Sequence, residues 1–434
     1  MRIPFFGRAQ RNAEPSKATD DDLLAAIRAD LQALGAVFGD APSETSTGPA
    51  ECARFDVTAA LAGSAGLGVA LALEVLRDGV TVRLVNDADE ILDHVYCPQR
   101  VAPYTLAVFA EPGAALTLRV GHITPASAAV VHQAAGFAFP HAALAPVRLA
   151  PQRDLGDVAH WPADPFAEPG VEDAAGRLRD RVFRNLRRPA EISWLRDLRV
   201  WLEPGDEQSH CLLKWGLYEP ESLALMERHL TPGGVAVDVG ANCGLFTLVA
   251  ARAVGPLGRV IALEPSPREF ARLQANVALN DFRQVTCHAA AATATPGPVM
   301  LRIAEPPFGG HNTLAGEFSY EAVKLAELCE TPGETLDALL HDEARCDLIK
   351  LDVEGAELHA LRGADSTLSR LRPKLLLEIN PGALAGHGTR STEISAWLAE
   401  RGYDIYGIDG RSGELVEYSA DDTRTVNIFA TPRT

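Results

Sequence analysis

The pattern of hydrophobic and polar positions changes along the chain of 434 residues. Hydrophobic residues first recur at helical spacing over residues 20–38. Over residues 52–150 they alternate with polar ones, with turn signals such as Asp78-Gly79 between the runs. From about residue 191 onward, apolar runs alternate with helix-like segments, which is typical of a parallel sheet covered on both faces. The pattern predicts an N-terminal helix and linker (1–50), a small all-β sandwich domain (51–150), a linker and helix (151–190) and an α/β domain (191–434).

An apolar run in the α/β domain, Val235–Val239, ends in a glycine-rich segment with the sequence DVGANCG. A helix-like segment follows it. Strand, glycine turn and helix together bring the backbone close to a ligand at a helix N-terminus, and glycine permits the tight turn. We therefore expect four residues of this segment to bind a cofactor: Asp238, Gly240, Asn242 and Gly244.

The spacing of this loop and its acidic residue indicate the kind of cofactor. Dinucleotide-binding folds also use a glycine loop, but the spacing here is G-x-N-x-G and not G-x-G-x-x-G. Asp238 lies inside the turn, where an anion repels a pyrophosphate and attracts a sulfonium or an amino group. The loop therefore disfavours an NAD-dependent oxidoreductase. No Gly-Lys-Ser/Thr follows it, which disfavours a P-loop enzyme.

Two further segments complete the predicted cofactor site. Glu264 follows the next strand, Arg259–Leu263, about twenty residues past the loop, where a carboxylate can accept hydrogen bonds from two ribose hydroxyls. Taken alone, Glu264 would equally suit a helix cap or a surface position. The apolar stretch over residues 284–292 contains small side chains around Ala290, which could leave a flat slot for an adenine ring or only pack tightly.

Charged residues cluster where another buried strand of the domain ends. They lie in the sequence DLIKLDVEGAELHAL at residues 347–361 and are Lys350, Asp352, Glu354 and Glu357. Ligands of open α/β sheets bind at this edge, and clustered ionisable groups are costly unless paired or functional. We expect Asp352 or Glu354 to take the proton from an acceptor hydroxyl, with Lys350 positioning it. A salt-bridged junction between strand and helix is the structural alternative.

Three residues are candidates for binding the acceptor: Glu357, Glu378 and His311. Glu378 lies near the end of a further strand, Lys374–Ile379. His311 lies in a glycine-rich segment, residues 307–316, which could form a lid over the pocket. A lone histidine is more often a surface or structural residue, so His311 is the weaker candidate.

Composition and charge limit the class of function. The net charge of −18 argues against a nucleic-acid-binding surface, which needs a basic stripe. The seven cysteines form no CxxC pair, so no zinc site is indicated, and scattered thiols fit a reducing compartment. The N-terminus does not resemble a secretory signal, and no apolar run is long enough to span a membrane. We therefore expect a cytoplasmic protein.

In their order along the chain, these motifs resemble the FkbM family of S-adenosylmethionine-dependent methyltransferases over residues 191–434. The matching pieces are GLYEPE (216–221), Pro232-Gly233, DVGANCG, GRVIALEP, Thr335-Leu336-Asp337, DLIKLDVEGAE and Leu377-Glu378-Ile379. The resemblance implies a class I, Rossmann-like sheet of seven mostly parallel strands, S-adenosylmethionine as donor and an oxygen acceptor on a sugar or natural product. One departure is that residues 291–297 lack the acidic residue often found there in the family, which leaves the adenine contact open.

Within the all-β region, residues 104–120 resemble paired strands of a carbohydrate-binding-module sandwich. The first hypothesis is therefore an O-methyltransferase acting on a hydroxyl of a sugar, glycan or natural product, with a β domain that holds a glycan. The alternative is a non-catalytic glycan-binding or scaffold protein with a degenerate methyltransferase fold, against which the intact loop and Glu264 argue. A metal-assisted reaction stays open because three carboxylates lie close in sequence. The oligomeric state is not predicted.

Overall fold

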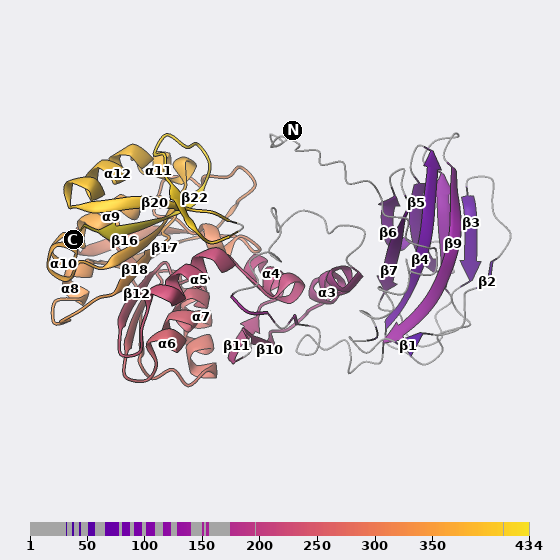
Figure 1. Ribbon diagram of the computed structural model, residues 1–434, viewed down its shortest axis with the longest axis horizontal. Coiled ribbons are helices and arrows are strands. Elements are labelled where there is room, and N and C mark those ends of the chain that lie inside the picture. The colour runs from indigo at the N-terminus through magenta and orange to yellow at the C-terminus, as the bar shows by residue number, and fades with distance from the viewer. Residues whose placement is uncertain are drawn as a thin grey trace. The chain divides into compact units, whose positions relative to one another are not determined.

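The structure is a computed structural model, drawn in Figure 1. It describes residues 174–195, 197–410 and 412–433, together with residues 150, 151 and 153–155. In the N-terminal part it describes residue 32 and nine strands.

The chain divides into two compact units. The first comprises Met1–Ala145 and Pro169–Leu178, and the second comprises Pro146–Glu168 and Arg179–Thr434. The border runs through helix α3 (Ala174–Arg184), so the second unit includes residues that precede the predicted start at residue 191. None of the helices in the described part of the chain has the length and hydrophobicity needed to cross a lipid bilayer.

The first unit contains two antiparallel sheets. One has the order β1 (Val37–Phe38), β9 (Ala128–Phe139), β4 (Gly66–Arg77) and β7 (Val101–Val108). The other has the order β2 (Ser43–Glu44), β3 (Glu51–Asp56), β8 (Leu116–His122), β5 (Val80–Asn86) and β6 (Ile91–Cys97). These strands confirm the all-β character of the region; the sandwich stays a prediction.

Two predictions about the first unit were wrong in detail. The strands within residues 104–120 do not pair with each other, because β7 pairs with β4 while β8 pairs with β3 and β5 in the other sheet. The helix expected over residues 20–38 does not reach its predicted end, since Val37–Phe38 pairs with β9 as a strand. Residue 32 is helical, and the rest of that segment lies outside the described residues.

The second unit is built on one eight-stranded sheet. In spatial order its strands are β14 (Val285–His288), β13 (Arg259–Leu263), β12 (Val235–Val239), β18 (Leu348–Leu351), β19 (Lys374–Ile379), β22 (Val426–Pro432), β20 (Tyr403–Ile408) and β21 (Leu415–Glu417). The first five are parallel, whereas β22 runs antiparallel to both β19 and β20. The α/β class is confirmed, with one strand more than the seven implied by the resemblance, because β21 adds an edge.

Helices cover both faces of this sheet, which explains why its central strands are continuous apolar runs. Figure 1 shows α5 (Pro220–His229), α6 (Leu245–Val254) and α7 (Pro267–Leu279) on one side. On the other side lie α8 (Leu336–Leu339), α9 (Glu357–Arg362), α10 (Asp365–Leu371), α11 (Pro381–Gly386) and α12 (Ser391–Glu400). In β13, Ile261 and Leu263 join the core that contains Leu358, while Ala262 between them packs with Leu273 of α7.

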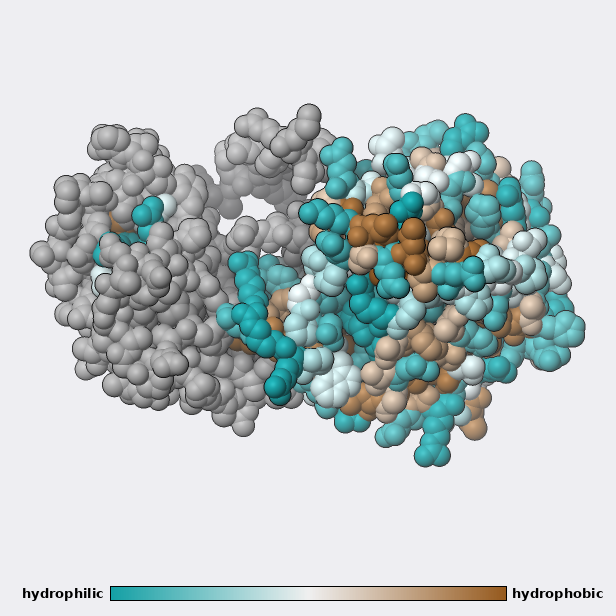
Figure 2. Space-filling view, turned by 180° about the vertical axis from the view of Figure 1, so that it is seen from behind, coloured by the Kyte–Doolittle hydropathy of each residue, from teal (hydrophilic) through white to brown (hydrophobic). Residues whose placement is uncertain are grey.

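Smaller elements complete the second unit. They are the hairpin β10 (Ala190–Trp194) and β11 (Leu198–Leu202), helix α4 (Glu207–Trp215), and a three-stranded sheet of β15 (Ala291–Ala292), β17 (Leu325–Glu334) and β16 (Gly297–Ala304). A short 3₁₀ turn, η4 (Gly309–His311), lies in the connection from β16 to β17. On the face shown in Figure 2, hydrophobic side chains of this unit gather in patches that are surrounded by hydrophilic ones.

Candidate active site

A cavity of about 280 Å³ lies at the carboxyl ends of the central strands, where open α/β sheets bind their ligands. The loop after β12 and Glu264 line one part of its wall, together with Ala290. Lys350 of β18, the residues that follow β18, and Glu378 near the end of β19 line another part. The cavity therefore brings together residues that lie far apart in the sequence. They include Gly240, Asn242, Ala290, Lys350, Asp352, Glu354 and Glu378.

The loop after β12 has the tight geometry that its glycines predict. Gly240 has a φ of 76°, and a Cβ on it would lie 1.8 Å from the carbonyl oxygen of Asp352. Gly244 has a φ of 96°, and a Cβ there would meet Leu273 at 2.7 Å. A side chain at either position would combine left-handed backbone strain with a clash, so the loop needs both glycines. Gly240 lines the cavity and Gly244 packs behind it, outside the lining residues.

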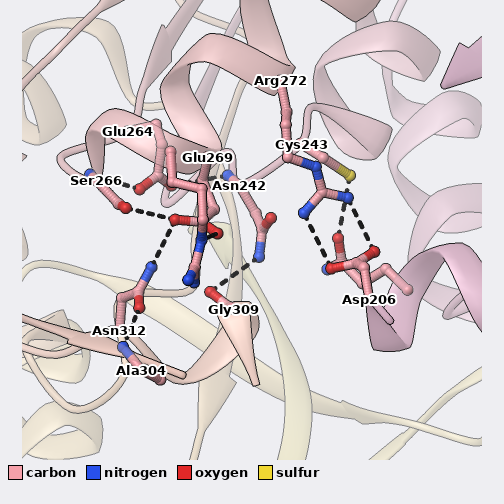
Figure 3. A network of polar contacts seen from close by, with 12 residues as sticks. Asp206, Asn242, Cys243, Glu264, Ser266, Glu269, Arg272, Ala304, Gly309 and Asn312 are labelled. Carbon is pink, nitrogen blue, oxygen red and sulfur yellow. Dashed lines mark hydrogen bonds and ion pairs between the residues drawn. The ribbon is translucent and has the colours of Figure 1, made fainter. Parts of the chain in front are cut away.

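Glu264 is buried and holds the loop through the backbone. Its Oε2 accepts a hydrogen bond from the backbone N–H of Asn242 and its Oε1 accepts one from Ser266, each at 2.8 Å (Figure 3). Burial raises the pKa of Glu264 to about 7, although these two hydrogen bonds favour the ionised form. Each carboxylate oxygen can accept a second hydrogen bond, which leaves room for two hydroxyl donors from a ligand.

Lys350 connects the loop to the carboxylates of the opposite wall. Its ammonium donates to the carbonyl oxygen of Gly240 at 3.0 Å and lies 3.2 Å from a carboxylate oxygen of Asp352. Burial disfavours the charged form, but Asp352 and Asp238 outweigh it and raise the pKa of Lys350. Lys350 is therefore a fixed buried cation shared by both walls.

Asp238 is not among the residues that line the cavity. Its Oδ2 accepts a hydrogen bond from the hydroxyl of Thr247 at 2.6 Å, and its Oδ1 lies 3.6 Å from the ammonium of Lys350. The side chain is almost fully buried. Its negative charge thus acts on the cavity through Lys350 and the loop rather than by direct contact.

Three carboxylates meet at the ends of β18 and β19. Asp352, Glu354 and Glu378 place one oxygen each within 4.8 Å of one another. Burial raises the pKa of Glu378 well above its ordinary value, and the neighbouring charges of Asp352 and Glu354 add to this effect. An oxygen-rich group of this kind suits protons, hydroxyl donors or a hard divalent cation. The metal-assisted alternative therefore stays open, with Glu378 and not Glu357 as the third carboxylate.

Glu357 faces the protein interior. Its Oε1 accepts hydrogen bonds from the backbone N–H groups of Val353 and Gly355, each at 3.2 Å, and the residue does not line the cavity. Burial raises its pKa to about 7. The geometry favours a structural role in ordering the turn after β18, in place of the acceptor contact expected from sequence.

His311 lines the cavity from the glycine-rich segment. Its Nδ1 lies 3.1 Å from a carboxylate oxygen of Glu354, and its ring contacts Tyr320 at a centroid distance of 5.0 Å. The hydrogen bond and charge of Glu354 raise the pKa of His311, although burial alone would lower it. The structure thus brings His311 and Glu354, 43 positions apart, into one pair.

Two asparagines join the segment that carries His311 to the loop after β12 and to helix α7. Asn242 donates to the carbonyl oxygen of Gly309 at 3.5 Å, and Asn312 donates to the carboxylate of Glu269 at 3.0 Å (Figure 3). The side-chain oxygen of Asn312 also accepts a hydrogen bond from the backbone N–H of Ala304 at 2.9 Å. The segment expected to form a lid is therefore held over the loop by side-chain contacts.

The stretch around Ala290 forms part of the cavity wall, together with Ala291 and Ala292. All three residues are buried. Their small side chains leave space on this side of the cavity, which is compatible with the predicted slot for a flat ring.

Several lining residues were not found as individual candidates from sequence. They are Asp206, Glu207, Gln208, Tyr218, Glu219 and Tyr320. Glu219 has a φ of 40° directly before Pro220, and burial raises its pKa to about 7. The piece GLYEPE contains it and is the only sequence signal for this group. The carboxylates among the lining residues make the cavity strongly acidic.

Most of the residues that line this cavity lie in a part of the chain that is similar to known proteins. Residues 238–405 match the methyltransferase FkbM domain. Methyltransferase sdnD of Sordaria araneosa is 29% identical over 197 residues, which cover 39% of this chain and 73% of that protein. Methyltransferase 1 of Beauveria bassiana is 30% identical over 159 residues, which cover 33% of this chain and 63% of that protein. An S-adenosylmethionine-dependent O-methyltransferase structure from Thermotoga maritima is 16% identical, covers 50% of this chain and 66% of that one, and has a TM-score of 0.29.

Proposed function

Residues 238–405 are an FkbM methyltransferase domain, and from this premise we propose that the protein methylates a hydroxyl of a sugar, a glycan or another natural product. The chain is a methyltransferase whose cofactor is S-adenosylmethionine. The observation that carries the proposal is the division of the cavity wall into a backbone-rich loop with Glu264 and a group of carboxylates. The first suits the donor and the second suits an acceptor that carries hydroxyl groups.

The residues of the loop fit the donor. Glu264 keeps hydrogen-bonding capacity for two ribose hydroxyls, and the small wall at Ala290 suits adenine. We propose that Gly240 and Asn242 approach the donor with their backbone, while Gly244 supports the loop from behind. The acidic wall complements the positive charge of a sulfonium, and Asp238 supports this field through Lys350.

The acceptor side must position an oxygen and remove its proton. S-adenosylmethionine supplies an already activated methyl group, so orientation of the acceptor is the main task of the protein and is worth about 7–11 kcal/mol in ideal cases. A neutral hydroxyl is a poor nucleophile, and a base is expected beside it. We propose Asp352 and Glu354 for this step, with Lys350 positioning Asp352 and Glu378 holding a further hydroxyl.

The glycan part of the proposal rests on the sequence of residues 104–120, which resembles a carbohydrate-binding module although its strands lie in two different sheets. The two antiparallel sheets of the first unit provide the extended surfaces that such modules use. A chain lacking residues 1–145 is the direct test of this part. We expect it to keep donor binding and to lose rate on glycan acceptors.

The whole proposal is tested by calorimetry with S-adenosylmethionine and by tritiated-methyl transfer to cell glycan and lipid extracts. We expect donor binding and labelling of a hydroxyl-containing fraction, which the Asp352→Asn variant should label far more slowly. A chain that binds no donor would instead support the scaffold alternative. A chelator should leave the rate of labelling unchanged. A loss of labelling with the chelator would show that the three carboxylates hold a divalent cation in the reaction.

A further inference from the structure

We propose that His311 is the group that takes the proton of the acceptor hydroxyl, and that Glu354 is a positioning residue that orients its ring. The inference rests on the proposed function and refines one step of it. His311 takes the proton in place of Asp352 and Glu354, which hold the acceptor and orient the ring. It also assigns a catalytic role to the glycine-rich segment between β16 and β17.

The geometry of His311 and Glu354 is that of a base and its positioning group. Nδ1 of His311 lies 3.1 Å from the carboxylate of Glu354, so in the neutral ring the tautomer that carries its proton on Nδ1 is favoured. Nε2 then carries the free lone pair. Among the described residues, Nε2 has no hydrogen-bond partner, and a quarter of the His311 side chain remains accessible at the cavity. This is the arrangement in which a carboxylate orients an imidazole base.

Both His311 and Glu354 are held in place by contacts with neighbouring segments. Glu354 has a φ of 51°, and its carbonyl oxygen accepts a hydrogen bond from the hydroxyl of Thr313 at 3.1 Å. His311 lies between Gly309 and Asn312, which are joined to Asn242 and Glu269. A left-handed backbone at a glutamate costs energy and persists only where the surroundings enforce it. The pair is therefore placed by the cofactor loop on one side and the turn after β18 on the other.

The carboxylates that line the cavity are less suited than His311 to accept the proton of the hydroxyl. The charge of Asp352 is already matched by the ammonium of Lys350 at 3.2 Å. Glu378 lies among Asp352, Glu354 and Glu219, whose charges oppose its ionisation. The groups that face His311 are Glu354, Glu207 and Asp352, all acidic, and they stabilise an imidazolium once it forms. His311 is thus the lining group that can gain a positive charge most easily.

In the proposed step, the acceptor oxygen forms its bond to the methyl carbon as the bond from that carbon to sulfur breaks. The hydroxyl proton moves to Nε2 of His311, and the sulfur keeps the electron pair. The imidazolium is held by Glu354 and returns its proton to solvent after the products leave. Charge and atoms balance without any further reactant.

Nitrogen NMR of the full chain labelled in its histidines tests the pair without an acceptor. The resonance lost in His311→Gln identifies the ring. We expect the neutral form to carry its proton on Nδ1, and Glu354→Gln to lower the pKa of this ring by at least one unit. A neutral ring protonated on Nε2, or an unchanged pKa in Glu354→Gln, would overturn the proposal.

His288 provides the matched control. Its Nδ1 lies 3.8 Å from Glu334, and its side chain is exposed to a similar extent, but it does not line the cavity. His288→Gln should leave the His311 resonances unchanged. On an extract that the wild type labels, His311→Gln should lower the rate about 10²-fold or more while His288→Gln does not, which follows the usual contribution of a general base.

The same experiments separate this inference from the proposed function. Binding of S-adenosylhomocysteine to the wild type tests the donor site, and its absence would overturn the methyltransferase proposal alone. The position of the proton on His311 is measured on the protein without that probe. Equal rates for His311→Gln and the wild type, with donor binding intact, would exclude His311 as the base and leave methyl transfer standing.

Discussion

The two walls of the cavity use charge in different ways. On the donor wall, the carboxylate of Glu264 is tied to two backbone N–H groups, and the loop that it holds is shaped by glycines. On the acceptor wall, Asp352, Glu354 and Glu378 interact with side chains and with one another. Backbone contacts survive most substitutions, whereas contacts between side chains change with each one. The proposed donor site is therefore specified by the fold, and the proposed acceptor site by individual residues.

If this comparison holds, substitutions on the donor wall should change cofactor affinity, and substitutions on the acceptor wall should change kcat. Lys350 is the exception, because it touches both walls.

The largest effect is expected from Lys350→Met, which breaks the comparison by damaging both walls. The variant leaves Asp238 and Asp352 without their cation, and removing one partner of a buried ion pair typically costs about 3–5 kcal/mol. The free energy of unfolding in urea should fall by that amount. Lys324→Met on the exposed surface is the control and should change it by less than about 0.5 kcal/mol. Equal values for both variants would show that Lys350 is not a structural cation.

Asp352→Asn should separate the walls most clearly. The amide keeps the volume but cannot hold the acceptor hydroxyl or balance Lys350, so we expect kcat to fall by about 10²-fold or more. The Kd for S-adenosylmethionine, measured by calorimetry, should stay within about twofold of the wild-type value. The lost charge near the sulfonium accounts for this small change. A variant that loses donor binding and keeps kcat would reverse the assignment of the two walls.

Glu264→Gln sharpens the comparison from the donor side. With a pKa of about 7, Glu264 is partly protonated at neutral pH, and the protonated form has less capacity to accept ribose hydroxyls. The affinity of the wild type for S-adenosylmethionine should therefore rise as pH increases from 6 to 8 and then level off. The variant should bind about tenfold more weakly and lose this pH dependence, since the lost hydrogen bond is worth about 1–1.5 kcal/mol. Glu327→Gln on the exposed part of β17 should behave as the wild type.

The donor wall could be predicted from sequence to a large extent, because its signals are local. Strands β12 and β13 are short apolar runs, and the glycine spacing between them reports a turn that only glycine can form at Gly240. The parallel order of the strands predicts where the loops lie, because the residues that follow parallel strands meet at one edge of the sheet. The parallel pairing of β18 and β19 likewise brings the carboxylates of Asp352 and Glu378 to one edge of the sheet.

The direction of a side chain was much harder to predict. Asp238 and Glu357 are each next to cavity-lining residues in sequence, yet both point into the protein and satisfy backbone or buried groups. The pairing of His311 with Glu354 depends on how a connection folds back over the sheet, for which the hydrophobic pattern contains no period. Tyr218 and Glu219 reach the cavity from the segment before α5, which precedes the sheet altogether.

The smallest effect is expected from Glu357→Gln, and it tests whether this carboxylate belongs to either wall. The amide oxygen can still accept hydrogen bonds from the backbone N–H groups of Val353 and Gly355, so donor affinity and kcat should stay within about twofold of the wild type. Stability should show a difference with a defined sign. The pKa of Glu357 is raised from 4.5 to about 7 in the folded state, so its contribution to stability is fully present below the unfolded value and is lost as pH rises through 7. The variant has no such loss, and in urea unfolding it should gain on the wild type between pH 5 and pH 8. A large drop in kcat at constant stability would instead return Glu357 to the acceptor wall, where the sequence alone had placed it.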